Sequence, residues 1–191
     1  SERGVSALFS WGDVDGDGRL DLAAVGATGT LQLLVSSGDG RFEDVTERMG
    51  LAGVPNAALA LWADYDADGR QDLFVGVRSG ASRLFHNDGG RFTDMSAGSG
   101  LASAGAVQSA QWLDHDGDGR LDLFVATTEK NEIFHGLEGG FFERAELPLA
   151  GMSKVPGPGG SIVLTNGDSA DAADAPPVSG SSGKSHAQGR P

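Results

Sequence analysis

One nine-residue pattern, D-x-D-x-D-G-x-x-D, occurs three times in this chain of 191 residues. The copies begin at Asp13, Asp64 and Asp114, at intervals of 51 and 50 residues, and each follows a tryptophan and precedes a leucine. The segments "GDGRF", "DGGRF" and "EGGFF" recur downstream with similar spacing. Self-similarity at such a period indicates one supersecondary unit per repeat, stacked on its neighbours. The predicted repeats span about 1–50, 51–100 and 101–150.

Each repeat is predicted to form four short β-strands. The second repeat contains four short runs bounded by Gly, Asn and Asp, at 57–62, 72–77, 82–87 and 91–96. Runs of this length between turn residues are typical of hairpins. The fold class is therefore all-β, with β-propeller-type blades of four antiparallel strands. A helix pair per repeat is the alternative, but the "DGR" and "DGG" interruptions leave too little length for two helices.

The aspartate pattern places four carboxylates around one tight loop. Alternate spacing lets successive carboxylates point into one concavity, and the glycine at the sixth position allows the sharp turn. The backbone carbonyl of the arginine at the seventh position can then point inward as a further ligand. The predicted ligands are Asp13, Asp15, Asp17, Arg19 and Asp21; Asp64, Asp66, Asp68, Arg70 and Asp72; and Asp114, Asp116, Asp118, Arg120 and Asp122. Without a cation, two carboxylates about 4 Å apart repel by about 4 kcal/mol at an effective dielectric constant near 20.

Oxygen ligands in this number favour Ca²⁺, which accepts six to eight of them at variable geometry, over Mg²⁺, zinc or copper. The sequence therefore predicts three Ca²⁺ sites. Solvated Asp-Gly turns are the alternative, and three patterns in register argue against it. An EF-hand is disfavoured because Ala24, Val75 and Val125 occupy the twelfth position, where an EF-hand needs a bidentate glutamate, and because the flanking segments are β-rich.

These residues resemble a known family. The segment "WGDVDGDGRLDL", with "LFHNDGGRFTDMS" downstream in the second repeat, is similar to the FG-GAP/VCBS repeat. The resemblance covers residues 1–150 and implies integrin-type β-propeller blades with a calcium loop between the first two strands of each. It also implies that all twelve aspartates named above are metal ligands. The FG and GAP signatures of integrins are absent, so the resemblance does not imply integrin-like ligand binding.

Histidines and tryptophans recur at equivalent positions. His86 and His135 lie on a predicted strand, and His115 lies inside the third loop at a non-ligand position. We interpret them as solvent-facing or wedged strand side chains. The tryptophans are predicted to pack between blades, with Trp11 and Leu22 facing the interior, and a carbohydrate-stacking set is the alternative. No Ser, His and Asp arrangement typical of a nucleophilic enzyme is recognisable, so the chain is predicted not to be an enzyme.

The formal net charge of −13 repels phosphate groups, so nucleic acid and anionic membrane surfaces are improbable partners. No apolar run approaches the roughly 20 residues of a membrane span, which excludes direct membrane insertion through a helix. The absence of cysteine removes disulfide and zinc-thiolate chemistry. Together with the predicted use of Ca²⁺ as a staple, this composition fits an exported protein in the periplasm or outside the cell.

The composition changes after residue 150. Five of the seven prolines lie in 151–191, which indicates a linker or an extended Pro/Gly-rich C-terminal arm. Within it, "SIVL" precedes Asn166, Asp168 and Asp174, which match the first, third and ninth loop positions. The segment is therefore predicted to open a degenerate partial fourth repeat.

Three blades and a fragment are too few to close a propeller ring, which typically has four to eight blades. The open edges need cover, so the predicted partner is a protein or further blades that complete the propeller. The predicted function is that of a calcium-binding, non-enzymatic, exported module that binds proteins or serves as a scaffold subunit of a larger periplasmic or cell-surface assembly. The alternative is an accessory, carbohydrate-binding domain of a secreted carbohydrate-active enzyme.

Overall fold

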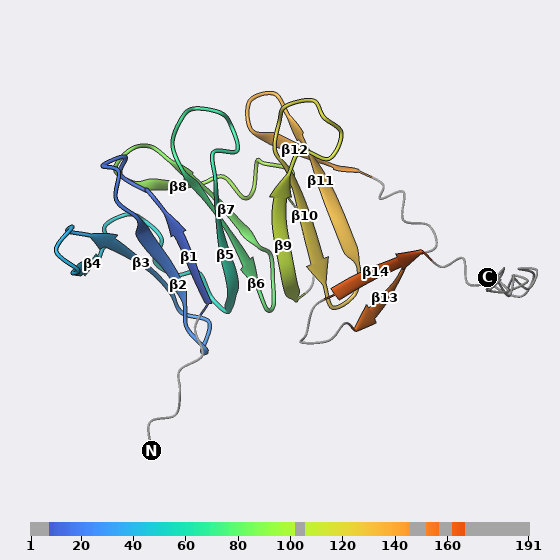
Figure 1. Ribbon diagram of the computed structural model, residues 1–191, viewed down its shortest axis with the longest axis horizontal. Coiled ribbons are helices and arrows are strands. Elements are labelled where there is room, and N and C mark those ends of the chain that lie inside the picture. The colour runs from blue at the N-terminus through green and yellow to red at the C-terminus, as the bar shows by residue number, and fades with distance from the viewer. Residues whose placement is uncertain (1–7, 102–105, 146–151, 157–161, 167–191) are drawn as a thin grey trace, which may run out of the picture. The chain divides into compact units, whose positions relative to one another are not determined.

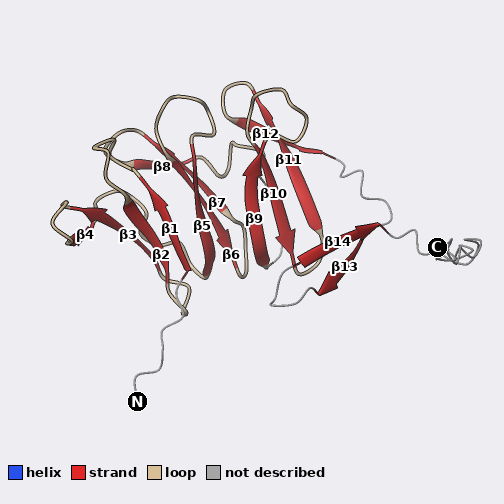
Figure 2. Ribbon diagram, in the orientation of Figure 1, coloured by secondary structure: helices blue, strands red, loops and turns tan. Residues whose placement is uncertain are grey.

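The computed structural model describes residues 8–101, 106–145, 152–156 and 162–166. The chain divides into two compact units, Ser1–Leu147 and Pro148–Pro191. All regular secondary structure in the described residues is β-strand (Figure 2), and these residues contain no helix long and apolar enough to cross a membrane.

The first unit contains three four-stranded sheets, which we call blades 1, 2 and 3 (Figure 1). Blade 1 consists of β1 (Leu8–Gly12), β2 (Asp21–Val25), β3 (Leu31–Ser36) and β4 (Phe42–Asp44). Blade 2 consists of β5 (Ala57–Ala63), β6 (Asp72–Val77), β7 (Arg83–Asn87) and β8 (Phe92–Asp94). Blade 3 consists of β9 (Val107–Leu113), β10 (Asp122–Thr127), β11 (Asn131–Leu137) and β12 (Phe141–Ala145). Strands pair antiparallel in chain order, which confirms the predicted all-β fold with four-stranded antiparallel blades.

The hydrophobic core lies between the blades. β2 and β6 are buried along their whole lengths, and blade 2 lies between the other two blades (Figure 1). One core cluster joins blades 1 and 2 through residues such as Leu33, Leu73 and Val75, and a second joins blades 2 and 3 through Phe74 and Phe134. Each blade therefore covers a face of its neighbour, as stacked repeats require.

The tryptophan before each loop packs across a blade boundary where a preceding blade is present. Trp62 Nε1 donates a hydrogen bond to the carbonyl oxygen of Ser10 (3.1 Å), and a methyl group at Gly12 would lie 2.8 Å from Trp62 Cγ. Trp112 stacks on Tyr65 of blade 2, with ring centroids 6.4 Å apart. The predicted packing between blades is thus confirmed for these two tryptophans.

The prediction for Trp11 is wrong. The Trp11 side chain is 54% exposed, whereas Leu22, at the other end of the same motif, is buried as expected. Trp11 contacts Phe42 in the same way that Trp62 contacts Phe92, with centroids 6.2 Å apart in both pairs. Phe92 is 3% exposed because blade 1 covers it, and Phe42 is 42% exposed. In the described part of the chain, blade 1 has no preceding blade to cover this pair.

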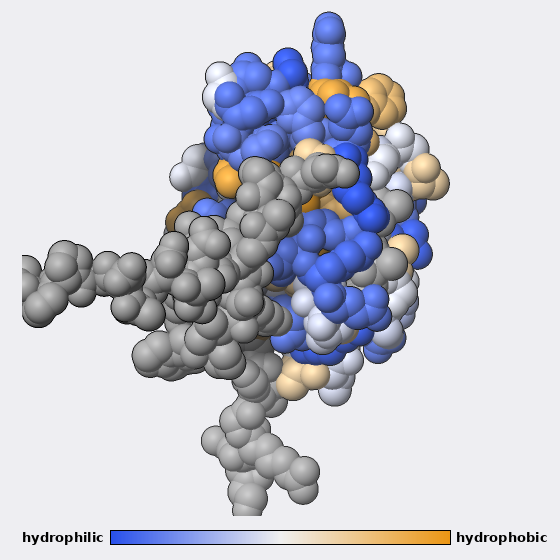
Figure 3. Space-filling model, turned by 90° about the vertical axis from the view of Figure 1, so that its right-hand side faces the viewer, coloured by the Kyte–Doolittle hydropathy of each residue, from blue (hydrophilic) through white to orange (hydrophobic). Residues whose placement is uncertain are grey.

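The three Asp loops extend from the same end of their blades (Figure 1), because each joins the first strand of a blade to the second. On the side of the molecule that Figure 3 shows, most of the described surface is hydrophilic, and hydrophobic residues appear there only as small patches.

The second unit contains one described hairpin, β13 (Met152–Pro156) and β14 (Ile162–Asn166), paired antiparallel. β14 includes most of the "SIVL" run that was expected to precede a fourth loop. The other predicted loop positions, Asp168 and Asp174, lie outside the described residues, as does the rest of the predicted arm.

Candidate metal-binding loops

Each Asp loop begins just after the first strand of a blade and ends on the first residue of the second strand. The glycine at the sixth position has a positive φ in all three loops: +83° at Gly18, +88° at Gly69 and +87° at Gly119. Residues other than glycine rarely adopt this backbone conformation, so the predicted sharp turn and its glycine requirement are confirmed.

The ninth aspartate of each loop fastens the loop to the sheet. Asp21, Asp72 and Asp122 are the first residues of β2, β6 and β10, and all three are almost completely buried. Asp21 Oδ2 accepts a hydrogen bond from the N–H of Val14 (2.9 Å), and Oδ1 accepts one from the N–H of Ser36 on β3 (2.9 Å). The other two loops repeat both bonds. Two backbone donors thus stabilise each buried carboxylate and tie the loop to the third strand.

The first aspartate of each loop is oriented by loop N–H groups. Asp13 Oδ1 accepts hydrogen bonds from the N–H groups of Gly16 (2.9 Å) and Asp17 (3.1 Å), and Oδ2 accepts one from Gly18 (2.9 Å). The third loop repeats this pattern in full, and the second repeats the bonds from its fifth and sixth positions. The loop's own N–H groups therefore curl the backbone around the first carboxylate.

Carboxylate oxygens converge in all three loops. Three sets of aspartates offer oxygen atoms within 4.8 Å of one another: Asp13, Asp15 and Asp17; Asp64, Asp66 and Asp72; and Asp114, Asp116 and Asp118. Asp68 and Asp122 belong instead to clusters that contain histidine, and Asp21 belongs to none of the clusters found among the described residues. The all-oxygen sets match the donors that hard divalent cations prefer, so these acidic clusters could hold metal ions.

The arginine at the seventh position has a role that the sequence did not predict. Arg19 Nε donates a hydrogen bond to the carbonyl oxygen of Ser36 on β3 (3.2 Å), and Arg19 Nη2 pairs with Asp17 Oδ2. Arg70 and Arg120 repeat both contacts in their own blades. The guanidinium group therefore bridges loop and sheet and neutralises part of the local charge. That the carbonyl oxygens of Arg19, Arg70 and Arg120 are ligands stays a prediction.

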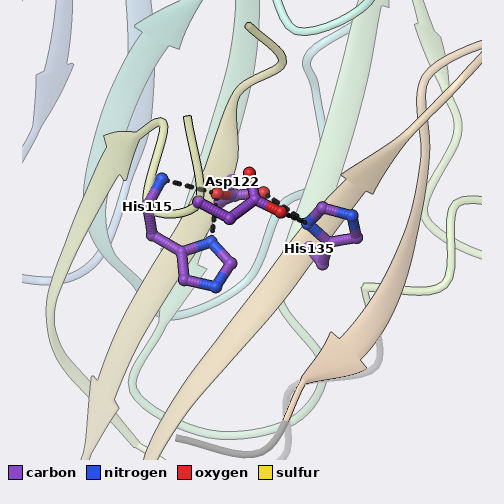
Figure 4. Close-up of side chains that lie close together, drawn as sticks. His115, Asp122 and His135 are labelled. Carbon is purple, nitrogen blue, oxygen red and sulfur yellow. Dashed lines mark hydrogen bonds and ion pairs between the residues drawn. The ribbon is translucent and has the colours of Figure 1, made fainter. Parts of the chain in front are cut away.

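The histidines lie against the loops, where the sequence reasoning did not expect a contribution to the site. His86 Nδ1 is 3.1 Å from Asp66 Oδ2 and 3.3 Å from Asp72 Oδ1. In blade 3, the rings of His115 and His135 approach Asp122 from two different elements (Figure 4). Hairpin register is the signal that was missed: Leu73 pairs with Phe85 and Leu123 with Phe134, so the preceding aspartate faces the following histidine in both hairpins.

Equivalent aspartates differ in acidity because burial dominates at Asp72, whereas hydrogen bonds, including those from His115, dominate at Asp122. Burial, reinforced by the charge of Asp66, raises the pKa of Asp72 to about 6. Burial also acts to raise the pKa of Asp122, but hydrogen bonds from the Gly136 N–H and from the backbone and ring of His115 outweigh it and hold this pKa below its ordinary value. The bond to Asp122 in turn raises the pKa of His115. The third loop thus favours the charged form of its buried carboxylate, whereas the second loop raises the proton affinity of Asp72.

These pKa shifts predict an unusual pH dependence for the metal-free protein. Because folding raises the pKa of Asp72 to about 6 and that of His115 above its ordinary value, the folded chain binds more protons near pH 6 than the unfolded chain. This stabilisation is present at low pH and is lost as the pH rises through the folded pKa values. The thermal midpoint of the metal-free chain should therefore increase from about pH 7 to about pH 5.

Protons compete with a cation for the same carboxylates, so the increment in midpoint that added Ca²⁺ produces should shrink over the same pH range. Melting curves at three pH values, with and without Ca²⁺, measure how the metal-free midpoint and the Ca²⁺-induced increment each depend on pH. A metal-free midpoint that falls steadily from pH 7 to pH 5 would contradict the assignment.

The second loop carries a local strain that the others avoid. Ala67 has φ +60°, whereas Gly16 and Gly117 hold the equivalent position with φ +75° and +77°. A left-handed conformation costs a residue with a Cβ roughly 1 kcal/mol. We expect Ala67→Gly to stabilise the chain by up to about 1 kcal/mol in urea denaturation, and the reciprocal Gly117→Ala to destabilise it similarly. Destabilisation by Ala67→Gly, or stabilisation by Gly117→Ala, would be inconsistent with this backbone assignment.

Comparison with known families agrees with the geometry of the loops. The family model described as "FG-GAP-like repeat" matches residues 13–75 and 64–125, and these two matches together include all three Asp loops. No match is found among curated proteins. A family match over more than half of the chain, on blades of four antiparallel strands with an acidic loop after the first strand, confirms the resemblance seen in the sequence. The chain belongs to the family of FG-GAP-like repeat proteins.

Proposed function

We propose that the chain is a calcium-stabilised, non-enzymatic module that binds other proteins. Ca²⁺ is supported by the all-oxygen clusters in the three loops and by a loop backbone that already curls around the first carboxylate. Millimolar Ca²⁺ outside the cell suits loops with dissociation constants of roughly 10⁻⁴ to 10⁻³ M. An exported location, in the periplasm or at the cell surface, is therefore part of the proposal.

The protein-binding role is supported by exposed apolar residues on blade 1. Leu8, Phe9, Trp11, Leu20 and Phe42 are each more than two-fifths exposed and lie on β1, on β4 or in the first Asp loop. Of these, Trp11 and Phe42 contact each other, and exposed apolar patches of this kind mark protein–protein contacts. In blades 2 and 3, the tryptophan that corresponds to Trp11 packs against the preceding blade.

The partner is proposed to present a blade-like surface. At the boundary of blades 1 and 2, blade 1 offers Trp62 a backbone carbonyl at Ser10 and a glycine at position 12 that leaves room for the ring. A partner that covers Trp11 in the same way would offer an unpaired carbonyl and a small residue. Further FG-GAP-like blades, in this chain's own assembly or in another subunit, meet both requirements.

Carbohydrate binding by an accessory domain of a secreted enzyme is the second candidate, because an exposed Trp11 beside Phe42 could stack on a sugar ring. The exposed Phe9, which lies on the same face of β1 as Trp11, favours a protein, since sugar sites place polar groups around the stacking ring.

A photo-crosslinking amino acid at Phe9 should give protein adducts in a cell-envelope extract, and the same amino acid at Phe141, which is 50% exposed on blade 3, serves as control. Precipitation with insoluble polysaccharides tests the alternative in parallel. Retention on a polysaccharide that Trp11→Ala abolishes, with no adduct at Phe9, would reject the protein-binding role.

A further inference from the structure

The third loop differs from the other two in its nitrogen donors. His135 Nδ1 on β11 lies 3.2 Å from Asp122 Oδ1 and 3.3 Å from Asp116 Oδ2. His115 Nδ1, from the loop, contacts the other oxygen of Asp122, Oδ2. Figure 4 shows the two imidazole rings on either side of the Asp122 carboxylate. All four side chains offer a ligand atom within 4.8 Å of one another, so two nitrogen and two oxygen donors form one cluster.

Two of the separations are close to those in a four-coordinate site, whereas His115 Nδ1 lies at hydrogen-bonding distance from Asp122 Oδ2. Bonds of about 2.0–2.1 Å to a tetrahedral Zn²⁺ place neighbouring ligand atoms roughly 3.3–3.4 Å apart. The distances of 3.2 and 3.3 Å from His135 Nδ1 to two carboxylate oxygens are close to this value. Imidazole suits zinc and its first-row neighbours, whereas Ca²⁺ takes oxygen ligands at longer distances. We propose that His115, Asp116, Asp122 and His135 form a site for a zinc-type divalent ion.

Comparison of the repeats shows that the fold does not need these histidines. In the first repeat, Val14 and Val35 occupy the positions of His115 and His135, and Asp21 there still accepts the same two backbone hydrogen bonds. The histidines of the third repeat therefore add nitrogen donors to a loop that forms without them.

The second repeat is intermediate between the other two. It has Tyr65 at the loop position and His86 on the strand, and its histidine-containing cluster is Asp66, Asp68 and His86. The number of histidine donors at the loop thus rises from zero to one to two along the chain. Affinity for a zinc-type ion should rise in the same order, which makes the first and second loops internal controls for the third.

The zinc-type site deepens the proposed metal-binding function of the third loop and shares Asp116 and Asp122 with the proposed calcium ligands. The two ions should therefore exclude each other at this loop, while the first loop stays selective for Ca²⁺. Titration of the metal-stripped full chain with Zn²⁺ measures the affinity, and Co²⁺ serves as a spectroscopic probe because a four-coordinate ion with nitrogen ligands absorbs visible light. We expect one Zn²⁺ site per chain that binds at least about 10-fold more tightly than any other.

The double variant His115→Val plus His135→Val copies the residues of the first repeat and should weaken Zn²⁺ binding at the tight site by at least about 10- to 100-fold. His86→Val is the matched control and should leave the tight site unchanged. A thermal midpoint in Ca²⁺ close to that of the parent chain verifies that the double variant is folded, and the single variants His115→Gln and His135→Gln replace it otherwise.

Absence of Zn²⁺ binding, or tight binding that is unchanged in the histidine variants, would overturn the zinc-type site. If Ca²⁺ still stabilises the chain in that case, only this inference fails. If neither ion binds, the proposed calcium function fails as well.

Discussion

Removal of Ca²⁺ should lower the thermal midpoint of the chain by about 8–16 °C. A loop with a dissociation constant of about 0.1 mM gains about 1.4 kcal/mol from about 1 mM Ca²⁺, so three loops gain about 4 kcal/mol. For a chain of this size, each kcal/mol corresponds to a shift of about 2–4 °C. The physical origin is the repulsion among carboxylates that lie within 4.8 Å of one another.

Differential scanning calorimetry in excess Ca²⁺ and in excess chelator measures this shift. The double variant Asp64→Ala plus Asp68→Ala removes two carboxylates of the second loop and should lose about a third of the response, because the other two loops stay intact. Asp39→Asn serves as the control, because it removes one negative charge in the exposed turn between β3 and β4, outside the three Asp loops. This variant should keep the full response. A midpoint that does not respond to chelation would show that the loops are merely solvated turns.

Gly100→Ala should destabilise the chain by more than about 4 kcal/mol, enough to unfold a marginally stable domain. Gly100 has φ +85°, and a Cβ atom there would lie 1.9 Å from the carbonyl oxygen of Phe142. The Phe142 N–H donates to the carbonyl oxygen of the adjacent Ser99 (2.7 Å), so the two backbones cannot separate without breaking this inter-blade bond. Gly50 repeats the arrangement against Phe92 at the preceding boundary.

Gly53→Ala is the matched control for Gly100→Ala. Gly53 has a similar φ of +84°, but nothing lies within 4 Å of the added Cβ, so only the backbone strain of about 1 kcal/mol is expected. Urea denaturation of both variants in Ca²⁺ separates strain from collision. Equal destabilisation by the two substitutions would contradict the close approach of blades 2 and 3 at Gly100.

Much of the fold was predictable because its signals are local. The strands of blade 2 lie within one or two residues of the predicted runs, since apolar runs and turn residues determine where a strand begins and ends. β8 ends early, at Asp94, because Asp94 Oδ1 accepts a hydrogen bond from the N–H of Ser96 and turns the chain. Loop position and glycine requirement were likewise readable from the D-x-D-x-D-G spacing.

What the sequence could not supply were contacts between distant segments. The pattern makes Trp11 and Trp62 equivalent, and only the presence or absence of a covering blade decides which of them is exposed. The loop pattern predicts a role only for the carbonyl of the seventh-position arginine, because the chain in between must fold before the Arg19 side chain can reach Ser36. The position of His86 opposite Asp72 is predictable from the sequence, because the register of the β6–β7 hairpin pairs Leu73 with Phe85.

The number of Ca²⁺ ions bound per chain tests the central claim most directly. The claim is that the Asp loop of each of the three repeats binds one Ca²⁺ ion, which stabilises the fold. The metal-stripped chain is dialysed against about 1 mM Ca²⁺, and the bound metal is counted by elemental analysis. We expect close to three ions for the parent chain and close to two for the Asp64→Ala plus Asp68→Ala variant. No bound Ca²⁺, or an equal number on both chains, would contradict the claim.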